Sequence, residues 1–491
     1  MASLYRKHTS LSISVRSLVT ASITKSSYKR GRSLISASPV QLPFLSYSVV
    51  SNVGSATFGT SLCKATSLAN HSLSKYFSTT TSTNASSSSS SLSSQYPASQ
   101  IITLPQPFIT GLGAEIPNVK IKVEYHGDPT LPLSRTILIF PSFSHSSHVA
   151  SNFDDPSPGW WQEMVGAGKA IDTRHFRIIC LSVLGSPFSP TNPTSINPHT
   201  NKPWRTHFPQ LSPTDLARCH RAVLEVLGLT HSPVHAIIGS SLGGMQALQY
   251  GSLYPLSTAK IIAIAATGRT TPFTVAIRRM QRRAILSDPQ YFRGDYDDHR
   301  NGPWEGLRMA RELGTIFYRS RQEFDNRFAW NPTGDRHFTS TDTWEVESYL
   351  AYAGAKIIRR YDPNCYLLLS KCMDLQDLGD GYDNRISYAE GAQRIKAKCL
   401  LMGVIQDALI PMDELRTLAD TINSQSSSSS SSTPSSSTPQ AQFVPIDSIY
   451  GHDSFLKDFD FISQHIRNYL ESGLEEQLKA EAIHNTGSNA P

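Results

Sequence analysis

Residues 234–250, VHAIIGSSLGGMQALQY, decide the fold. The run VHAIIG (234–239) is apolar without interruption, which is typical of a strand buried on both faces. The residues after Gly243 open a helical pattern, and the junction GSSLG (239–243) fits G-x-S-x-G. Such a turn holds its central serine in a strained backbone conformation beside the positive end of the helix. We therefore predict that Ser241 is a nucleophile and that Ser240 packs the turn.

A serine hydroxyl is a weak nucleophile until a base removes its proton. His452 lies in YGHD (450–453), just past the last strand-like run, and Asp407 follows the strand-like CLLMGV (399–404). The chain order Ser241, Asp407, His452 is that of the α/β-hydrolase fold, in which the acid fixes the tautomer of the histidine. The sequence thus predicts a catalytic triad.

Acyl chemistry at Ser241 also requires two backbone N–H groups that stabilise an oxyanion. Leu242, directly after the nucleophile, supplies the first in this fold. The second is expected from the loop after TILIF (136–140), within PSFS (141–144). Backbone donors need no particular side chain, so these residues alone locate the second donor only to this loop.

Short apolar runs recur along the chain and alternate with helical stretches such as 215–227 and 412–422. This rhythm predicts an α/β fold with a mostly parallel central sheet covered on both faces. The runs are TILIF (136–140), FRIICLSV (176–183), VHAIIG (234–239), IIAIAA (261–266), CLLMGV (399–404) and FVPID (443–447).

The alternation of strands and helices stops within residues 270–395. This stretch has helical patterns around 271–286, 304–318 and 343–358 and little strand character. We expect an inserted helical lid. The hydrolase core is then divided into residues 101–269 and 396–470, followed by a C-terminal tail at 471–491. A Ser-rich stretch at 424–438 is expected to be a disordered surface loop of the second core part.

The N-terminal region differs from the rest in charge. Residues 1–114 contain nine Lys and Arg and no acid, whereas the remainder of the 491-residue chain holds 36 basic and 39 acidic residues. Residues 1–77 therefore predict a mitochondrial transit peptide for matrix import, with a Ser/Thr-rich linker at 78–100. A plastid transit peptide and a disordered Ser-rich tail share this composition and stay open as alternatives.

The remaining composition excludes several classes of partner. The acidic balance after the leader argues against nucleic-acid binding, and no stretch approaches the ~20 apolar residues of a membrane-spanning helix. The six cysteines have no C-x-x-C spacing, so buried free thiols are expected. No metal site is expected. His145 and His148 are spaced as two metal ligands can be, but no further ligands accompany them in the sequence.

Over nearly all of residues 101–470, the chain resembles a known family, the homoserine O-acetyltransferases and their serine O-acyltransferase relatives. The leader makes it most similar to the mitochondrial fungal serine O-acyltransferase branch. The strings that carry the resemblance are PGWWQEMVGAGKAIDTRHFRIIC (158–180), SINPHT (195–200), GSSLGGMQALQY (239–250), ILSDPQYFRGDY (285–296), YRSRQEFDNRF (318–328) and YGHDSFL (450–456).

The resemblance implies roles for further residues. The arginine that binds the amino-acid substrate falls on Arg311, a substrate-binding aspartate on Asp453, a pocket tyrosine on Tyr318 and the second oxyanion donor on Phe143. A guanidinium can clamp a carboxylate with two parallel hydrogen bonds, and a carboxylate can hold an ammonium group. Arg308, one helical turn before Arg311, is the rival for the arginine role.

The chain departs from the homoserine acetyltransferase pattern in two loops. The usual Asn-Val-Leu-Gly-Gly-Cys is replaced by SVLGSP (182–187), and the Ala-Leu-Thr-Gly string by SFSHSSHV (142–149). Ser186 adds bulk where glycine leaves space and Pro187 stiffens the loop, which we interpret as a pocket for an acceptor one methylene shorter. L-serine is thus the expected acceptor, and L-homoserine the alternative.

The predicted function is therefore an O-acyltransferase of amino-acid biosynthesis that forms O-succinyl- or O-acetyl-L-serine for cysteine synthesis. The donor is expected to be succinyl-CoA or acetyl-CoA, used as a co-substrate without any separate cofactor. The mechanism is ping-pong through an acylated Ser241. Relatives suggest a homodimer through lid helices. An esterase or lipase, which needs the same triad but no amino-acid clamp, is the more distant alternative.

Overall fold

The computed structural model describes residues 97–296, 301–333, 344–381, 385–424, 439–476 and 478. The predicted transit peptide (1–77), most of the predicted linker and all but Ser424 of the Ser-rich loop (424–438) lie outside these residues. The main sheet has eight strands. In spatial order they are β1 (Ser99–Thr103), β4 (Lys120–His126), β6 (Arg177–Leu181), β5 (Thr136–Phe140), β9 (Val234–Ser240), β10 (Thr258–Ile264), β11 (Lys398–Val404) and β12 (Ala441–Ile446).

The strands from β6 to β12 run parallel, and β4 is antiparallel to both β1 and β6. All six apolar runs of the sequence are strands of this sheet, so the prediction of a mostly parallel central sheet is confirmed. Two short hairpins flank it, β2 (Phe108–Ile109) with β3 (Glu115–Ile116) and β7 (Ile196–Asn197) with β8 (Lys202–Pro203).

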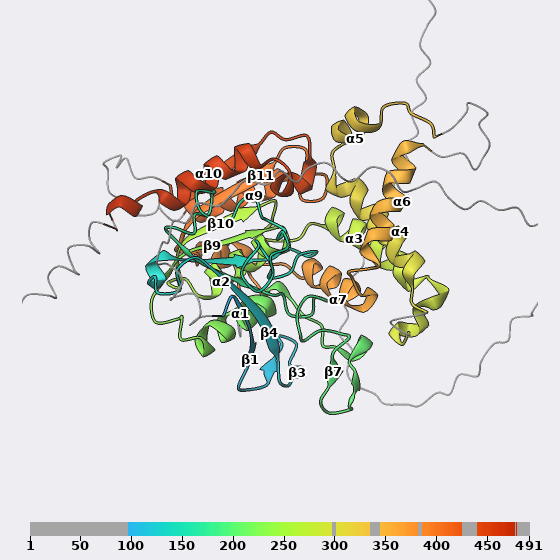
Figure 1. Ribbon diagram of the computed structural model, residues 1–491, viewed down its shortest axis with the longest axis horizontal. Helices are drawn as coiled ribbons and strands as arrows, with labels where there is room; N and C mark the ends of the chain where they lie inside the picture. The colour runs from blue at the N-terminus through green and yellow to red at the C-terminus, as the bar shows by residue number, and fades with distance from the viewer. Residues whose placement is uncertain are drawn as a thin grey trace, which may run out of the picture. The chain divides into compact units, whose positions relative to one another are not determined.

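Helices and loops bury both faces of the sheet (Figure 1). Every residue of β5 and β9 is buried, and successive side chains enter opposite cores. Leu138 and Ile237 pack in one core with side chains of α1 (Pro213–Val226), α2 (Leu242–Leu253) and α9 (Met412–Asn423). Ile139 and Ile238 pack in the other with α10 (Phe459–Glu471) and the segment 149–176.

Six α-helices of the described residues, besides the 3-10 helix η3 (Pro289–Gly294), lie between β10 and β11 in the chain. The predicted helices at 271–286, 304–318 and 343–358 are confirmed by the first, second and fourth of them. The six are α3 (Pro272–Leu286), α4 (Trp304–Tyr318), α5 (Arg321–Phe328), α6 (Glu345–Ile357), α7 (Pro363–Asp374) and α8 (Tyr388–Gln393).

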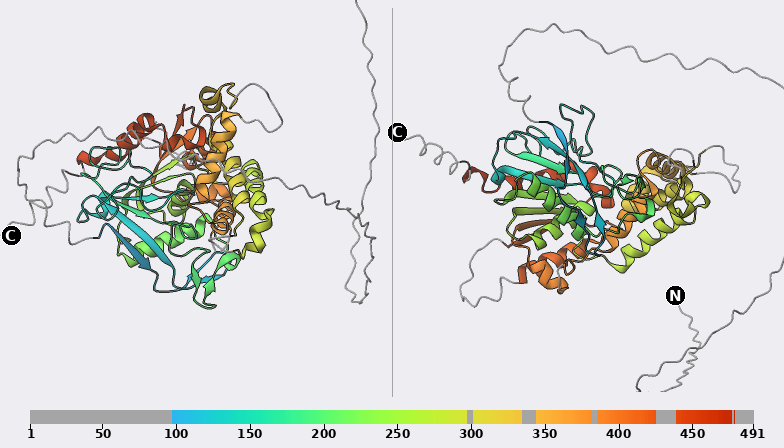
Figure 2. Two further views of the ribbon diagram at one scale, coloured as in Figure 1. Left: turned by 45° about the vertical axis from the view of Figure 1, so that its right-hand side comes forward. Right: turned by 90° about the horizontal axis from the view of Figure 1, so that it is seen from below.

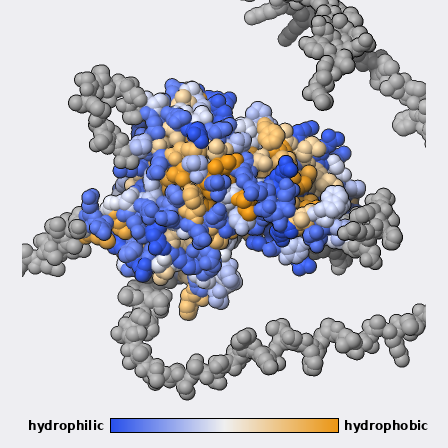
Figure 3. Space-filling view, turned by 90° about the horizontal axis from the view of Figure 1, so that it is seen from above, coloured by the Kyte–Doolittle hydropathy of each residue, from blue (hydrophilic) through white to orange (hydrophobic). Residues whose placement is uncertain are grey.

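The helices α3 to α6 form a lobe beside the sheet, seen in two further directions in Figure 2. By contrast, α8 packs on the core helices α2 and α9, and the Ser252 hydroxyl donates to the Gly391 carbonyl. The helical lid is thus narrower than the predicted 270–395. Apolar patches interrupt the charged surface of the lobe (Figure 3), where Phe273, Met280 and Met309 are about half exposed.

The ends of the core differ slightly from the prediction. Ser99 and Gln100 lie in β1 rather than in the linker, and α10 ends at Glu471, with the buried Leu474 packed behind it. The strand β4, at the antiparallel side of the sheet, was not predicted from the sequence, because charged residues alternate with apolar ones along it.

The cysteine prediction is confirmed for the described residues, in which all five cysteines are buried and free. Within the same residues, no helix is long and apolar enough to cross a bilayer.

Candidate active site

Ser241 sits on a sharp turn between β9 and α2. Its backbone has φ 52° and ψ −121°, a strained conformation for a residue with a side chain. The flanking glycines are required by close backbone packing, because a Cβ on Gly239 would lie 2.1 Å from the Gly243 carbonyl oxygen and one on Gly243 2.0 Å from that of Phe140. The sequence GSSLG therefore folds as a nucleophile elbow.

The structure brings the three predicted triad residues together from three separate segments. The Ser241 hydroxyl lies 2.9 Å from Nε2 of His452, whose Nδ1 lies 2.7 Å from Oδ2 of Asp407. His452 is carried by the 3-10 helix η5 (Gly451–Leu456), and Asp407 follows β11. The other Asp407 oxygen accepts the amides of Leu409 and Ile410, each at 2.8 Å. This geometry can transfer a proton from the serine to the histidine.

The environment of His452 favours its protonated form. Burial alone lowers the pKa of this histidine, but the charge and hydrogen bond of Asp407, with a further contribution from Asp453, outweigh burial and raise the pKa above 6.5. An imidazole of raised basicity is suited to accept the serine proton.

The predicted oxyanion donors lie on the two segments that flank Ser241. Leu242 is the first residue of α2, where backbone N–H groups have no intrahelical acceptor. Phe143 lies in the loop after β5, stacks on Tyr361 with ring centroids 5.0 Å apart and accepts the Tyr361 hydroxyl at its carbonyl oxygen (2.9 Å). This contact fixes the loop beside the nucleophile.

His145 and His148 lie in the same loop and form hydrogen bonds that hold it in place. His145 bonds to the Ser142 hydroxyl and stacks on Trp160, and burial together with Arg360 and Arg311 lowers the pKa of His145 to about 3, so the ring is neutral. His148 bonds to the buried Glu124 at 3.0 Å. Among the described residues, no group of three or more His, Cys, Asp or Glu is placed to hold a metal ion.

A cavity of about 80 Å³, here called the catalytic cavity, opens at the triad. Arg311, Tyr318 and Asp453 line it with Ser241 and His452, so the residues implied by the resemblance share one site. The Arg311 guanidinium lies 5.3 Å from the centre of the Tyr318 ring. Arg308, the rival, does not line this cavity and pairs instead with Glu305 (3.4 Å) on the surface of α4.

Burial raises the pKa of Tyr318 above 10, so its hydroxyl stays protonated beside the His452 ring, whose centre is 6.0 Å from that of Tyr318. A neutral phenol can donate a hydrogen bond to a bound substrate.

A second cavity, of about 600 Å³, adjoins the catalytic cavity and is here called the vestibule. The two share Ser144, His145 and Arg311 in their linings. The vestibule is lined by five cationic side chains and by no Asp or Glu; the cations are Arg311, Arg319, Arg327, Lys356 and Arg360. Of these five cations, only Arg319 has an acidic partner among the described residues. The vestibule can therefore attract a polyanion.

The comparisons with known proteins identify relatives of this chain. Residues 135–430 match the family model described as alpha/beta hydrolase fold. The serine O-succinyltransferase of Litchfieldella anticariensis is 38% identical over 76% of this chain and 98% of its own. The homoserine O-acetyltransferase of Symbiobacterium thermophilum is 37% identical over 79% of this chain and 97% of its own.

The chain belongs to the family of homoserine and serine O-acyltransferases, within the α/β hydrolases. Members of this family and esterases share one architecture. The crystal structure titled esterase E22 L374D mutant covers 76% of this chain and 99% of its own, with 27% identity and a TM-score of 0.67.

Ser186 and Pro187, where the loop departs from the family pattern, do not line the catalytic cavity. Ser186 is buried and accepts the Phe188 amide (3.3 Å), and neither Ser186 nor Pro187 lines either cavity. Phe188 lines the vestibule instead and packs edge-on against Tyr361. Neither residue is therefore placed to narrow the catalytic cavity by direct contact, and their role in acceptor specificity stays a prediction.

Sequence reasoning also missed Arg319, which in this O-acyltransferase binds Asp453 with 3.2 Å between Nη2 and Oδ2. It follows Tyr318 within the matched string YRSRQEFDNRF, which was the available signal.

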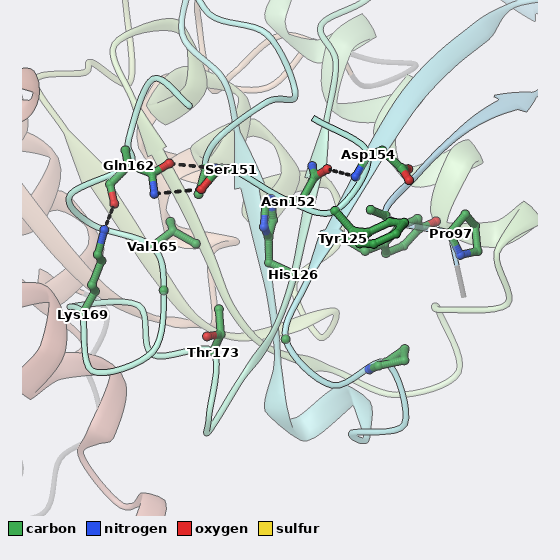
Figure 4. A pocket seen from close by; sticks show the side chains of 16 residues that line it. Pro97, Tyr125, His126, Ser151, Asn152, Asp154, Gln162, Val165, Lys169 and Thr173 are labelled. Carbon is green, nitrogen blue, oxygen red and sulfur yellow. Dashed lines mark hydrogen bonds between the residues drawn. The ribbon is translucent and has the colours of Figure 1, made fainter. Parts of the chain in front are cut away.

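A further cavity, of about 780 Å³, lies elsewhere, between the end of β4 and residues 150–173 (Figure 4). No triad residue lines it. Two of its polar side chains bond to the backbone of neighbouring residues: Gln162 accepts the Ser151 amide at 2.7 Å, and Lys169 donates to the Gln162 carbonyl. Burial lowers the pKa of His126, and within the part of the chain that the structure describes its Nε2 has no hydrogen-bond partner.

Proposed function

We propose that this enzyme transfers an acyl group from acyl-CoA to the hydroxyl of L-serine. The observation that carries the proposal is that Arg311 and Asp453 line the same small cavity as Ser241 and His452. Arg311 binds the acceptor's carboxylate and Asp453 its ammonium group, which brings the hydroxyl to the histidine. A hydrolase acting on simple esters has no use for this pair of charges.

In the first half-reaction Ser241 attacks the thioester carbonyl of acyl-CoA. His452 takes the serine proton, Asp407 stabilises the imidazolium, and the N–H groups of Leu242 and Phe143 bind the oxyanion. The carbon–sulfur bond then breaks, and the thiolate of CoA leaves with the proton from His452. The product is Ser241 carrying the acyl group as an ester.

In the second half-reaction the acceptor hydroxyl attacks this ester. His452 removes the hydroxyl proton and returns it to the Ser241 oxygen as the acyl–enzyme bond breaks. Transfer competes with hydrolysis, so water must be kept from the ester while the acceptor is held in line. The small catalytic cavity and its charged clamp serve this need.

The vestibule supports acyl-CoA as the donor. CoA carries phosphates, and guanidinium and ammonium groups bind phosphates through charge-assisted hydrogen bonds. Arg327, Lys356 and Arg360 have no acidic partner among the described residues and line the route to Ser241. Both succinyl-CoA and acetyl-CoA carry these phosphates, and neither requires a separate cofactor. We propose succinyl-CoA first, in line with the name of the Litchfieldella relative.

The small size of the catalytic cavity supports L-serine over L-homoserine, and the preference can be measured. We expect kcat/KM to favour L-serine by about 10- to 200-fold, the usual worth of one methylene in a fitted pocket. Met373 lines the cavity, so Met373→Ala should enlarge it and reduce the preference. The change Ser186-Pro187 to Gly-Cys serves as the comparison and should reduce the preference less, because neither residue lines the cavity.

The measurement is CoA release with each acyl-CoA in the presence of each amino acid. A wild-type enzyme that favours L-homoserine would return the chain to homoserine O-acetylation, the second candidate, which the Symbiobacterium relative supports. Release of CoA at one rate with or without any amino acid would instead indicate hydrolysis, as in an esterase.

We also propose that the protein is imported into the mitochondrial matrix. The support is the acid-free, basic composition of residues 1–77. Deleting these residues is expected to leave transferase activity intact and the protein in the cytosol, as read by fractionation of cells that express both forms. Import of the truncated form would contradict the proposal, and targeting of the full chain to plastids would select the alternative.

A further inference from the structure

The turn that carries His452 is tied to the lid by charges that lie outside the triad. The Arg319 guanidinium contacts Asp453 at 3.2 Å and, through Nη1, Glu323 at 3.2 Å. The same Glu323 oxygen accepts Lys457 Nζ at 2.9 Å. The four side chains thus alternate in charge between the start of α5 and the end of η5, and we name them the lid clamp.

Backbone contacts bring the same two segments together. The Ser320 hydroxyl donates to the Ile449 carbonyl. Gly451 has φ +60°, and a Cβ at this position would lie 2.9 Å from the Arg319 carbonyl carbon and the Ser320 nitrogen. The chain at 319–320 therefore lies directly against the residue that precedes His452.

The lid clamp also lies between the two cavities. Arg319 lines the vestibule and Asp453 lines the catalytic cavity, and each of these side chains is only 14% exposed. A partly buried, hydrogen-bonded network holds its geometry better than an exposed ion pair. Arg319 contacts Oδ2 of Asp453, and this same carboxylate lines the catalytic cavity.

We infer that Arg319 is a positioning residue for the acyl acceptor: together with Glu323 and Lys457 it fixes the Asp453 carboxylate, so that one oxygen is held by the lid and the other binds the acceptor's ammonium. This inference rests on the proposed function. The inferred role of Arg319 affects only the second half-reaction, because formation of the acyl-enzyme involves no ammonium group.

The lid clamp should also influence His452 through charge. The groups that act on His452 are Asp407, Asp453 and Arg278, with the neutral Tyr318 and Ser241 beside the ring. The negative charge of Asp453 favours protonated His452, and Arg319 offsets that charge. Removing the Arg319 charge should therefore move the acidic limb of kcat/KM to higher pH, whereas Arg319→Lys should restore it.

The test compares the half-reactions in the full-length enzyme. Glu323→Gln removes the charge that orients both Arg319 and Lys457 but lines neither cavity. With saturating succinyl-CoA or acetyl-CoA and no acceptor, the burst of CoA release should stay within about twofold of wild type. With L-serine added, KM for L-serine should rise by about 10- to 100-fold, the usual worth of a hydrogen bond to a charged group.

Arg319→Met should show the same rise together with the pH shift, and Arg319→Lys should recover part of both. Arg321→Met is the matched control, because Arg321 lies two residues away, is 93% exposed and pairs only with Asp325 among the described residues. This variant should behave as wild type in every assay.

Two results would overturn the inference while leaving the proposed function in place. One is an equal fall of both half-reactions in Glu323→Gln with a lower Tm, which would show a purely structural role. The other is an unchanged KM for L-serine in Glu323→Gln and Arg319→Met. If wild type itself transfers no acyl group to an amino acid, the proposed function and the inference fail together.

Discussion

Ser241→Ala is expected to lower the rate of acyl transfer by at least about 10⁴-fold, because loss of the nucleophile removes the covalent route entirely. What remains is the slow direct reaction that the oxyanion donors and substrate binding support. The fold should be unaffected. Alanine tolerates the strained φ of 52° no worse than serine, and the hydroxyl bonds only to His452 among the described residues.

The direct measurement is the mass of the protein after incubation with acyl-CoA alone. Wild type should gain one acyl group, located after proteolysis on the peptide that contains Ser241. Ser240→Ala is the matched control, since its buried hydroxyl has no hydrogen-bond partner in the described structure, and it should acylate as wild type does. An adduct on another residue, or activity that survives in Ser241→Ala, would refute the assignment.

Most of the core is predictable from the sequence, because each of its strands and turns carries the signal for its structure in its own residues. The strand at 234–240 and the glycines around Ser241 carry their own signals, namely continuous apolar burial and backbone contacts that exclude a side chain. β1 gives no such signal, because it is a short edge strand in which only Ile102 is buried. The chain position of Asp407 and His452 sufficed to place them, since parallel strands end at one edge of a sheet.

The rest of the site depends on contacts between distant segments, which one sequence does not reveal. The pairing of Arg319 with Asp453 joins residues 134 positions apart in the same way as Glu323 and Lys457, and no spacing rule predicts either. The loop around Ser186 shows the same limit. The sequence suggested that its bulk faces the acceptor, whereas in the structure Phe188 is the residue of this loop that lines a cavity, the vestibule.

Asp407→Asn should lower kcat by about 10⁴-fold in both half-reactions, through the tautomer of His452. The Asp407 oxygen that accepts the Leu409 and Ile410 amides must remain an acceptor, so asparagine will keep its carbonyl oxygen there. Its NH₂ group then faces Nδ1 of His452, in place of the carboxylate oxygen at 2.7 Å. That nitrogen must now accept, which places the ring proton on Nε2, where it blocks transfer from Ser241.

The pH profile and a second variant distinguish this effect from a general loss of structure. The Asp407 charge raises the pKa of His452, so the residual kcat/KM of Asp407→Asn should have its acidic limb at lower pH than wild type. Asp453→Asn removes a neighbouring charge without touching the tautomer, so its burst of CoA release should persist while its use of L-serine falls. A burst retained in Asp407→Asn would show that Asp407 does not orient the catalytic histidine, and the acid of this site would then have to be sought elsewhere.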